Sequence, residues 1–193
     1  MQKILLVTTN KKRAEKYKIF FQEHNINLDF DVLDQETPEI QSDNVKAVAE
    51  FSARWACQNY NLPVIKEDSS FEIPSLNNFP GVFVKFINQW IKAEGYVNLL
   101  LNQKDRRAGW HNVLTYCEPG GEMISFDAYT WGTIALRPSK KQVEESNWEA
   151  DRIWIPKGFS VPIIELDEII KKTKVFKRKK LKQFMSWYKT NRL

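Results

Sequence analysis

The sequence has little of what defines several protein classes. Its 193 residues contain no run approaching the roughly 18 apolar residues of a membrane span. Cys57 and Cys117 have no metal-ligand spacing with each other or with the two histidines, which favours two reduced core residues. Secretory-signal features are absent ahead of the apolar run at Ile4, so we expect a cytoplasmic location and no membrane partner.

Acidic residues are absent from the last 23 positions, where ten Lys and Arg lie. The first 170 residues hold 19 Lys and Arg against 24 Asp and Glu, a net charge of −5. This asymmetry indicates an anionic partner, which composition alone leaves open between nucleic acid, a membrane surface and a phosphorylated ligand. A hydrophobic content of 42% with seven Trp excludes a disordered chain, and the length suits one domain over 1–193 with two lobes.

Apolar periodicity predicts an α/β fold with a mixed sheet. The predicted strands cover 4–7, 30–33, 64–70, 108–117, 123–134 and 152–155. The predicted helices cover 12–23, 44–59, 82–91, 95–101 and the amphipathic basic tail. The run Glu118-Pro119-Gly120-Gly121 predicts a hairpin turn between the two long strands.

The segment Thr8-Thr9-Asn10-Lys11-Lys12-Arg13 lies where the first strand hands over to a helix. Free helix amides, the positive end of the helix dipole and three cations would converge there, as in an anion site. A plain capped helix with solvated lysines is the alternative. The segment lacks the glycine pattern of a P-loop or a dinucleotide-binding turn.

Carboxylates form the second candidate: Glu39, and Glu67-Asp68 at the end of an apolar strand. Mg²⁺ prefers carboxylate oxygens, and a carboxylate beside the metal can accept a proton from an attacking water. Acids exposed to solvent at a strand end are the alternative. Lys85, within an apolar segment, either contacts a ligand or extends along the helix surface.

These segments occur in an order that resembles the inosine triphosphate pyrophosphatase family. The matching blocks are Ile4–Arg13, Pro38-Glu39-Ile40-Gln41, and Pro63–Ser70 continuing through Phe79–Phe86. The resemblance covers most of the chain and is strongest in the first 135 residues. It implies hydrolysis of deaminated purine nucleoside triphosphates (ITP, dITP or XTP) to the monophosphate and pyrophosphate, with Mg²⁺ as cofactor. It also implies a homodimer and a central twisted mixed sheet with flanking helices, whose two lobes form a nucleotide cleft.

Carried over residue by residue, the resemblance implies roles for nine side chains. Glu39 and Asp68 would bind metal, with Asp68 also activating the water. The residues implied in substrate binding are Thr8, Asn10, Arg13, Lys85, Asp151, Lys172 and Arg178. A triphosphate needs such cations, a metal and helix-end amides more than it needs covalent catalysis.

Departures from the family pattern concentrate in the part that reads the base. Trp148-Glu149-Ala150-Asp151-Arg152 stands for a Phe-Gly-Trp-Asp-Pro-like segment, and Phe176-Lys177-Arg178 for a Ser-His-Arg signature. Trp148 or Trp154 could replace the missing stacking surface. The alternatives are therefore a pyrophosphatase for another modified nucleotide, or a degenerate member that binds nucleotide or nucleic acid. The retained carboxylates argue against a pure binder.

Overall fold

The computed structural model describes residues 3–24, 30–141, 148–176 and 178–192. Its strands form one mixed seven-stranded sheet in the order β2-β1-β3-β5-β6-β7, with β4 pairing with β3. The strands are β1 (Ile4–Val7), β2 (Phe30–Leu33), β3 (Val64–Ile73), β4 (Phe79–Gly81), β5 (Arg107–Cys117), β6 (Met123–Ile134) and β7 (Trp154–Pro156). The predicted α/β class with a mixed sheet is confirmed.

The helices differ widely in length. The α-helices are α1 (Lys11–Glu23), α2 (Val45–Tyr60), α3 (Val84–Leu99), α4 (Glu168–Ile170) and α5 (Lys179–Arg192). Three 3₁₀ turns and one π-helical turn complete the chain: η1 (Pro74–Leu76), η2 (Glu149–Arg152), η3 (Ile163–Glu165) and η4 (Lys171–Val175). The chain divides into unit 1 (residues 1–68 and 113–127) and unit 2 (residues 69–112 and 128–193).

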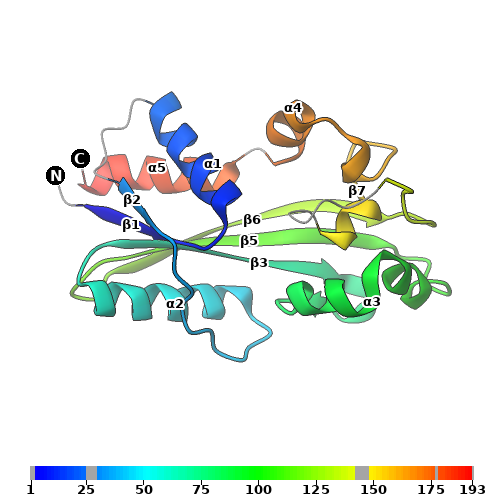
Figure 1. Ribbon diagram of the computed structural model, residues 1–193, viewed down its shortest axis with the longest axis horizontal. Coiled ribbons are helices and arrows are strands. Elements are labelled where there is room, and N and C mark those ends of the chain that lie inside the picture. The colour runs from blue at the N-terminus through cyan, green and yellow to red at the C-terminus, as the bar shows by residue number, and fades with distance from the viewer. Residues whose placement is uncertain (1–2, 25–29, 142–147, 177, 193) are drawn as a thin grey trace. The chain divides into compact units, whose positions relative to one another are not determined.

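In unit 1, β1 pairs in parallel with β2 and β3, and the helices α1 and α2 begin at asparagine caps (Figure 1). Asn10 accepts a hydrogen bond from the Arg13 amide, and Asn44 accepts from two amides of α2. Each cap satisfies helix amides that otherwise lack partners, which explains why both helices begin at these residues. The buried face of α2 packs with β1 and the start of β3, and this core includes the thiols of Cys57 and Cys117.

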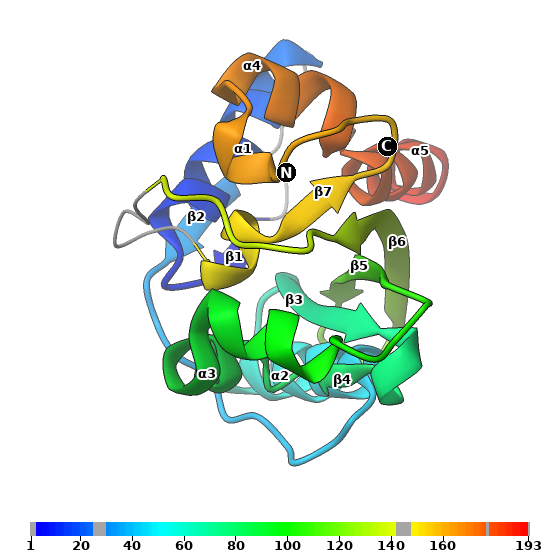
Figure 2. The same cartoon turned by 90° about the vertical axis from the view of Figure 1, so that its right-hand side faces the viewer.

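Unit 2 contains the helix α3 (Figure 2). The helix is interrupted at Lys92, whose φ of 53° is not helical. Its buried side packs with Phe71, Trp110, Ile153 and other residues of one apolar core. This core also holds Ala150 of η2 and Trp154 of β7. The segment 148–156 is thus fixed to α3 by packing as well as by the polar contacts described below.

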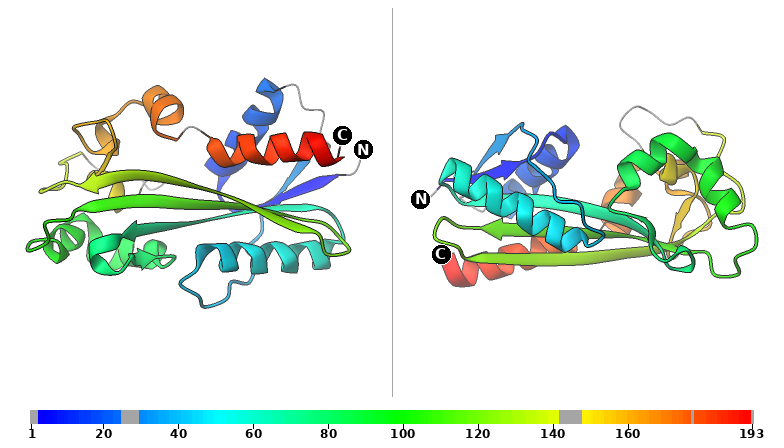
Figure 3. Two further views of the ribbon diagram at one scale, coloured as in Figure 1. Left: turned by 180° about the vertical axis from the view of Figure 1, so that it is seen from behind. Right: turned by 90° about the horizontal axis from the view of Figure 1, so that it is seen from below.

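The hairpin of β5 and β6 is the longest regular feature of the chain (Figure 3). At its turn, the Gly121 amide donates to the Glu118 carbonyl at 3.0 Å. Gly120 and Gly121 take φ values of 100° and 106°, which only glycine adopts at little cost. The predicted hairpin is confirmed.

Most predicted elements are confirmed within one or two residues, and three differ. The strand from Val64 does not end at Ser70 but continues to Ile73, because it pairs there with β4. The two short helices predicted after Gly81 form one interrupted helix, with the break at Lys92 and not at Glu94-Gly95. Arg152 does not begin a strand but ends η2, and β7 starts at Trp154.

The basic tail forms α5, as predicted from its amphipathic pattern. Its apolar side is buried through Leu181, Phe184, Met185 and Tyr188. Across the described ranges, every helix is too short or too polar to traverse a bilayer.

Candidate functional site

The turn after β1 is held by its own polar side chains. Thr8 is only 5% exposed, and its hydroxyl accepts a hydrogen bond from the Asn10 amide at 3.2 Å. Asn10 in turn caps α1 by accepting from the Arg13 amide at 2.9 Å. The exposed Lys11 and Lys12 begin the helix, so cationic groups and the positive end of a 13-residue helix lie together. This geometry is common to the two alternatives, an anion site and a capped helix with solvated lysines, so the anion site stays a prediction.

Arg13 turns inward and does not point freely to solvent. Its Nη1 donates to the Glu67 carbonyl at 2.8 Å, and its Nε lies 3.4 Å from Glu67 Oε1. Tyr17 donates its hydroxyl to Glu67 Oε2 at 2.7 Å, and Lys16 lies 4.0 Å from Oε1. Burial, followed by the charge of Glu67, raises the pKa of Tyr17 well above its ordinary value. The ionised carboxylate of Glu67 is thereby compensated inside the protein.

Lys66 lies next to Glu67 but belongs to the opposite face of β3, which it shares with Asp68. It is buried, and burial lowers its pKa although Asp68 and Glu39 act in the opposite direction. Glu36 also acts to raise the pKa of Lys66, and the charge of Arg13 acts to lower it. Ser52 of α2 donates to the Pro38 carbonyl at 3.1 Å, which ties the loop before Glu39 to a helix.

Glu39 and Asp68 fit a loosely held divalent cation. Within the described part of the chain, no group of three or more His, Cys, Asp or Glu side chains could hold a metal by itself. Mg²⁺ commonly keeps several waters and is bound through one or two carboxylates together with substrate phosphates. Glu39, which is exposed, and Asp68, which is half-buried, are a donor set of that kind.

The other four predicted residues belong to unit 2. Lys85 is exposed in the first turn of α3, and Asp151 is half-buried in η2. Arg178 follows η4 with a φ of 54°, and its amide donates to the Phe176 carbonyl at 2.8 Å. The backbone of Lys172 lies within η4, and Lys177 lies outside the described residues. The ring of Phe176 stacks 6.1 Å from that of Trp154, which brings the start of the tail to β7.

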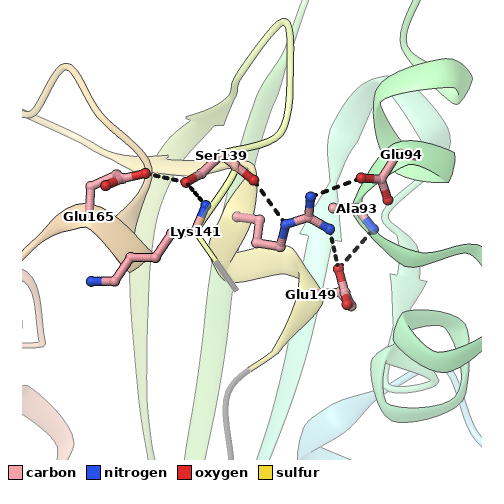
Figure 4. Close-up of polar contacts among 7 residues, drawn as sticks. Ala93, Glu94, Ser139, Lys141, Glu149 and Glu165 are labelled. Atoms are coloured by element: carbon pink, nitrogen blue, oxygen red, sulfur yellow. Dashed lines mark hydrogen bonds and ion pairs between the residues drawn. The ribbon is translucent and has the colours of Figure 1, made fainter. Parts of the chain in front are cut away.

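Arg152 holds the segment around Asp151 through three acceptors (Figure 4). Its guanidinium donates to Glu94 of α3 at 2.9 Å, to Glu149 at 3.0 Å and to the Ser139 carbonyl at 3.0 Å. Glu149 also accepts from the Ala93 amide at 3.4 Å. One planar, permanently charged side chain therefore connects η2, α3 and the loop after β6.

Aromatic and amide groups of unit 2 complete this arrangement. Asn88 of α3 accepts a hydrogen bond from the Ala150 amide at 3.1 Å, and the bond is buried. The half-buried ring of Trp148 lies 5.9 Å from that of Trp110 on β5. Trp154 is fully buried and donates its indole N–H to the Ala108 carbonyl. The prediction that Trp154 replaces the family's stacking surface is wrong, because Trp154 is part of the core. That Trp148 replaces it stays a prediction.

Sequence reasoning missed several residues that shape the two clusters. No sequence signal indicates that the hydroxyl of Tyr17, in the predicted helix 12–23, contacts Glu67. Arg152 lies in the predicted strand 152–155, and no local signal links it to Glu94, 58 residues earlier. Lys66 follows the apolar residues Val64 and Ile65 and precedes the carboxylate of Glu67. A lysine at such a position could have been noticed from the strand pattern alone.

Comparison with known proteins identifies the family. The profile of the Ham1 family matches residues 4–187. The chain is 34% identical over 190 residues to a dITP/XTP pyrophosphatase of Methanopyrus kandleri, covering 98% of this chain and 97% of that protein. It is 29% identical over 189 residues to a protein of the same name from Thermococcus kodakarensis, covering 98% of each.

Solved structures show the same fold. The Ham1 protein of Staphylococcus aureus superposes with a TM-score of 0.77 at 20% identity, covering 97% of this chain and 100% of that one. A HAM1 protein of Coxiella burnetii gives 0.75 at 22% identity, covering 98% and 100%. The relatives named above are pyrophosphatases of nucleoside triphosphates, so the fold and the family together define a hydrolase that acts on triphosphates. The chain belongs to the Ham1 family, which confirms the predicted resemblance.

Proposed function

We propose that the protein is a Mg²⁺-dependent nucleoside triphosphate pyrophosphatase that acts on deaminated purine nucleotides, ITP, dITP or XTP. It releases the monophosphate and pyrophosphate. The family assignment and the names of the relatives, dITP/XTP pyrophosphatases, support this activity. The observation that carries it in this chain is the helix start capped by Asn10, whose Arg13 donates to the Glu67 carbonyl, next in the chain to Asp68.

Unit 1 supplies the groups for the phosphates. Thr8, Asn10 and the amides at the start of α1 bind phosphate oxygens, and Glu39 and Asp68 hold the metal through oxygen ligands. Bound Mg²⁺ neutralises charge that develops on the phosphates during the reaction. Asp68 accepts the proton of the attacking water, which is a role for an ionised carboxylate at the metal. Arg13 acts mainly by holding Glu67, and through it the end of β3 that carries Asp68.

Unit 2 supplies the groups for the base and part of the triphosphate. Lys85 contacts phosphate from the first turn of α3. Asp151, Lys172 and Arg178 contact the nucleoside, with Trp148 as the aromatic surface. The cluster around Arg152 supports this assignment because it fixes η2, where Asp151 lies, to α3. Residues 1–193 act as a single domain, and we expect a homodimer located in the cytoplasm without a membrane partner; a nucleic-acid partner is the less favoured alternative.

A nucleotide panel with direct pyrophosphate detection tests the proposal. Purified protein with Mg²⁺ should release pyrophosphate, and no orthophosphate, from dITP, ITP or XTP faster than from dATP and dGTP. Chelation of Mg²⁺ should abolish the release. If the protein prefers a different modified nucleotide, the proposed substrate is wrong and the proposed pyrophosphatase activity stands. Absence of pyrophosphate from every triphosphate would overturn the proposed function, and salt-dependent binding of DNA or RNA would then favour the degenerate binder.

A further inference from the structure

Two buried hydrogen-bond donors beside the segment 148–150 have no partner among the described residues. One is the indole N–H of Trp110, whose side chain is 7% exposed, and the other is the amide nitrogen of Asn88, 5% exposed. A buried donor left unpaired is costly, so native structures seldom keep two of them close to one segment. Both therefore call for an acceptor.

The orientation of the Asn88 side chain follows from its hydrogen bond. The Ala150 amide can only donate, so the atom that faces it at 3.1 Å must be the side-chain oxygen of Asn88. The NH₂ group consequently points away from that bond, and it offers two donors. Trp110 has one polar atom, which can only donate. Both positions thus require an acceptor and reject a donor.

Trp148 connects these donors to the surface. The ring of Trp110 contacts Phe71 at 4.9 Å between centroids and Trp148 at 5.9 Å. Phe71 is fully buried, whereas Trp148 is half-buried. Of the two rings that contact Trp110, Trp148 is the more exposed, so a route from the surface to the buried donors passes its ring.

We propose that Trp110 and Asn88 are specificity-determining residues that donate hydrogen bonds to the carbonyl oxygens of an oxo-purine, with Trp148 moving to stack on the base. The inference rests on the proposed function, which it deepens by naming the groups that read the base. A hypoxanthine or xanthine ring presents carbonyl acceptors, and the amino group of adenine presents donors in the corresponding place. Discrimination is strong when a site is built to pair with a group that the competing substrate lacks.

The experiment compares kcat/KM for dITP and dATP in Trp110→Phe and Asn88→Asp. Trp110→Phe keeps an aromatic ring and removes the donor, and it should lower the dITP/dATP ratio about 3- to 10-fold. Asn88→Asp keeps an acceptor for the Ala150 amide and replaces the NH₂ by a second acceptor, and it should lower the ratio at least as much. The ratio is independent of the amount of folded enzyme, since both substrates meet the same preparation.

Tyr96→Phe is the matched control. It removes the buried hydroxyl of Tyr96, which has no partner in the described structure. The centroid of the Tyr96 ring lies 6.2 Å from that of Phe71. This change should leave the ratio within twofold of the parent. If Trp110→Phe and Asn88→Asp also leave the dITP/dATP ratio within twofold of the parent, the two donors do not read the base and the inference is overturned.

Binding of the product separates this inference from the proposed function. Tryptophan fluorescence during titration with inosine monophosphate and adenosine monophosphate should show tighter binding of the former. Trp110→Phe should narrow that difference even in a preparation without turnover. Equal affinity for the two monophosphates in the parent protein would overturn the inference while leaving pyrophosphatase activity to be judged by the nucleotide panel.

Discussion

The two units differ in how their polar groups are held. In unit 1, Glu67 is buried and receives Arg13, Tyr17 and Lys16, all from the helix that follows the first strand. In unit 2, Arg152 donates to Glu94 of α3, to Glu149 in its own turn and to the Ser139 carbonyl. Both clusters depend on contacts between residues 50 or more positions apart, Arg13 and Tyr17 with Glu67 in one and Arg152 with Glu94 in the other. They differ in the central group: a buried carboxylate accepts from its partners in unit 1, whereas a guanidinium donates to its partners in unit 2.

Asp68→Asn should show the largest effect and separates chemistry from recognition. The amide keeps the size of the side chain and removes the proton acceptor and metal ligand, so kcat should fall about 100- to 10,000-fold for every nucleotide. Asp151→Asn in unit 2 is the matched change and should act mainly on KM. Steady-state kinetics with pyrophosphate detection measures both. Equal losses of kcat in Asp68→Asn and Asp151→Asn would contradict the assignment of chemistry to unit 1 and of recognition to unit 2.

Arg13→Ala should give the largest loss of stability. It leaves the carboxylate of Glu67 buried with fewer partners, which should lower the free energy of unfolding by about 2–3 kcal/mol. Lys11→Ala, which removes an exposed cation from the same helix, should change it by less than about 0.5 kcal/mol. Urea unfolding measures both, and Arg13→Ala with Glu67→Gln should cost less than the sum of the single changes. Similar values for Arg13→Ala and Lys11→Ala would contradict a structural role for Arg13.

Arg152→Ala tests the long-range contacts of unit 2. Loss of the guanidinium frees η2 from α3, so KM for the preferred nucleotide should rise about fivefold while kcat changes little. Stability should fall by about 1–2 kcal/mol because partly exposed ion pairs contribute modestly. Arg107→Ala is the control, since that side chain pairs only with the nearby Asp105 in the described contacts. A fall in kcat without a change in KM would show that η2 takes part in the chemistry.

Substitution of Glu72 in unit 2 should have the smallest effect on stability, and that effect should depend on pH. Burial acts to raise the pKa of this carboxyl, but hydrogen bonds from His111 and Ser70 outweigh it and lower the pKa below the usual 4.5. Its contribution, about 1 kcal/mol, is present above pH 4.5 and is lost as the pH falls through the lowered value. Glu72→Gln should therefore destabilise the protein at pH 7 and not at about pH 3. Urea unfolding at several pH values measures this, with the exposed Glu15→Gln as control; a difference independent of pH would exclude the carboxylate as its cause.

Sequence patterns were sufficient for elements whose signals are local. The apolar run at Ile4, the cap at Asn10 and the glycine pair after Pro119 each specify their structure through neighbouring residues. Sequence patterns were insufficient where contacts with residues distant in the sequence determine the structure. The break in α3 at Lys92 coincides with contacts from η2 to Ala93 and Glu94, and β3 extends past Ser70 because β4 pairs with it.

The same distinction applies to the candidate site. Asp68 could be proposed from its place at the end of an apolar strand, and Glu39 and Asp68 together from the family resemblance; their role as metal ligands stays a prediction. Lys66 and Tyr17 could not be assigned roles, because burial and side-chain direction depend on packing between β3 and α1. The unpaired donors of Trp110 and Asn88 exist only as a property of the folded core.

The cap at Asn10 leaves the start of α1 without a negative side chain of its own. Aspartate caps helices about as well as asparagine does, and its charge favours the helix dipole. A carboxylate at this position would repel a phosphate that approached the same amides, whereas the neutral side chain would not. The asparagine cap is therefore compatible with the proposed phosphate site without requiring it, because Asn44 caps α2 in the same way and no ligand is proposed there.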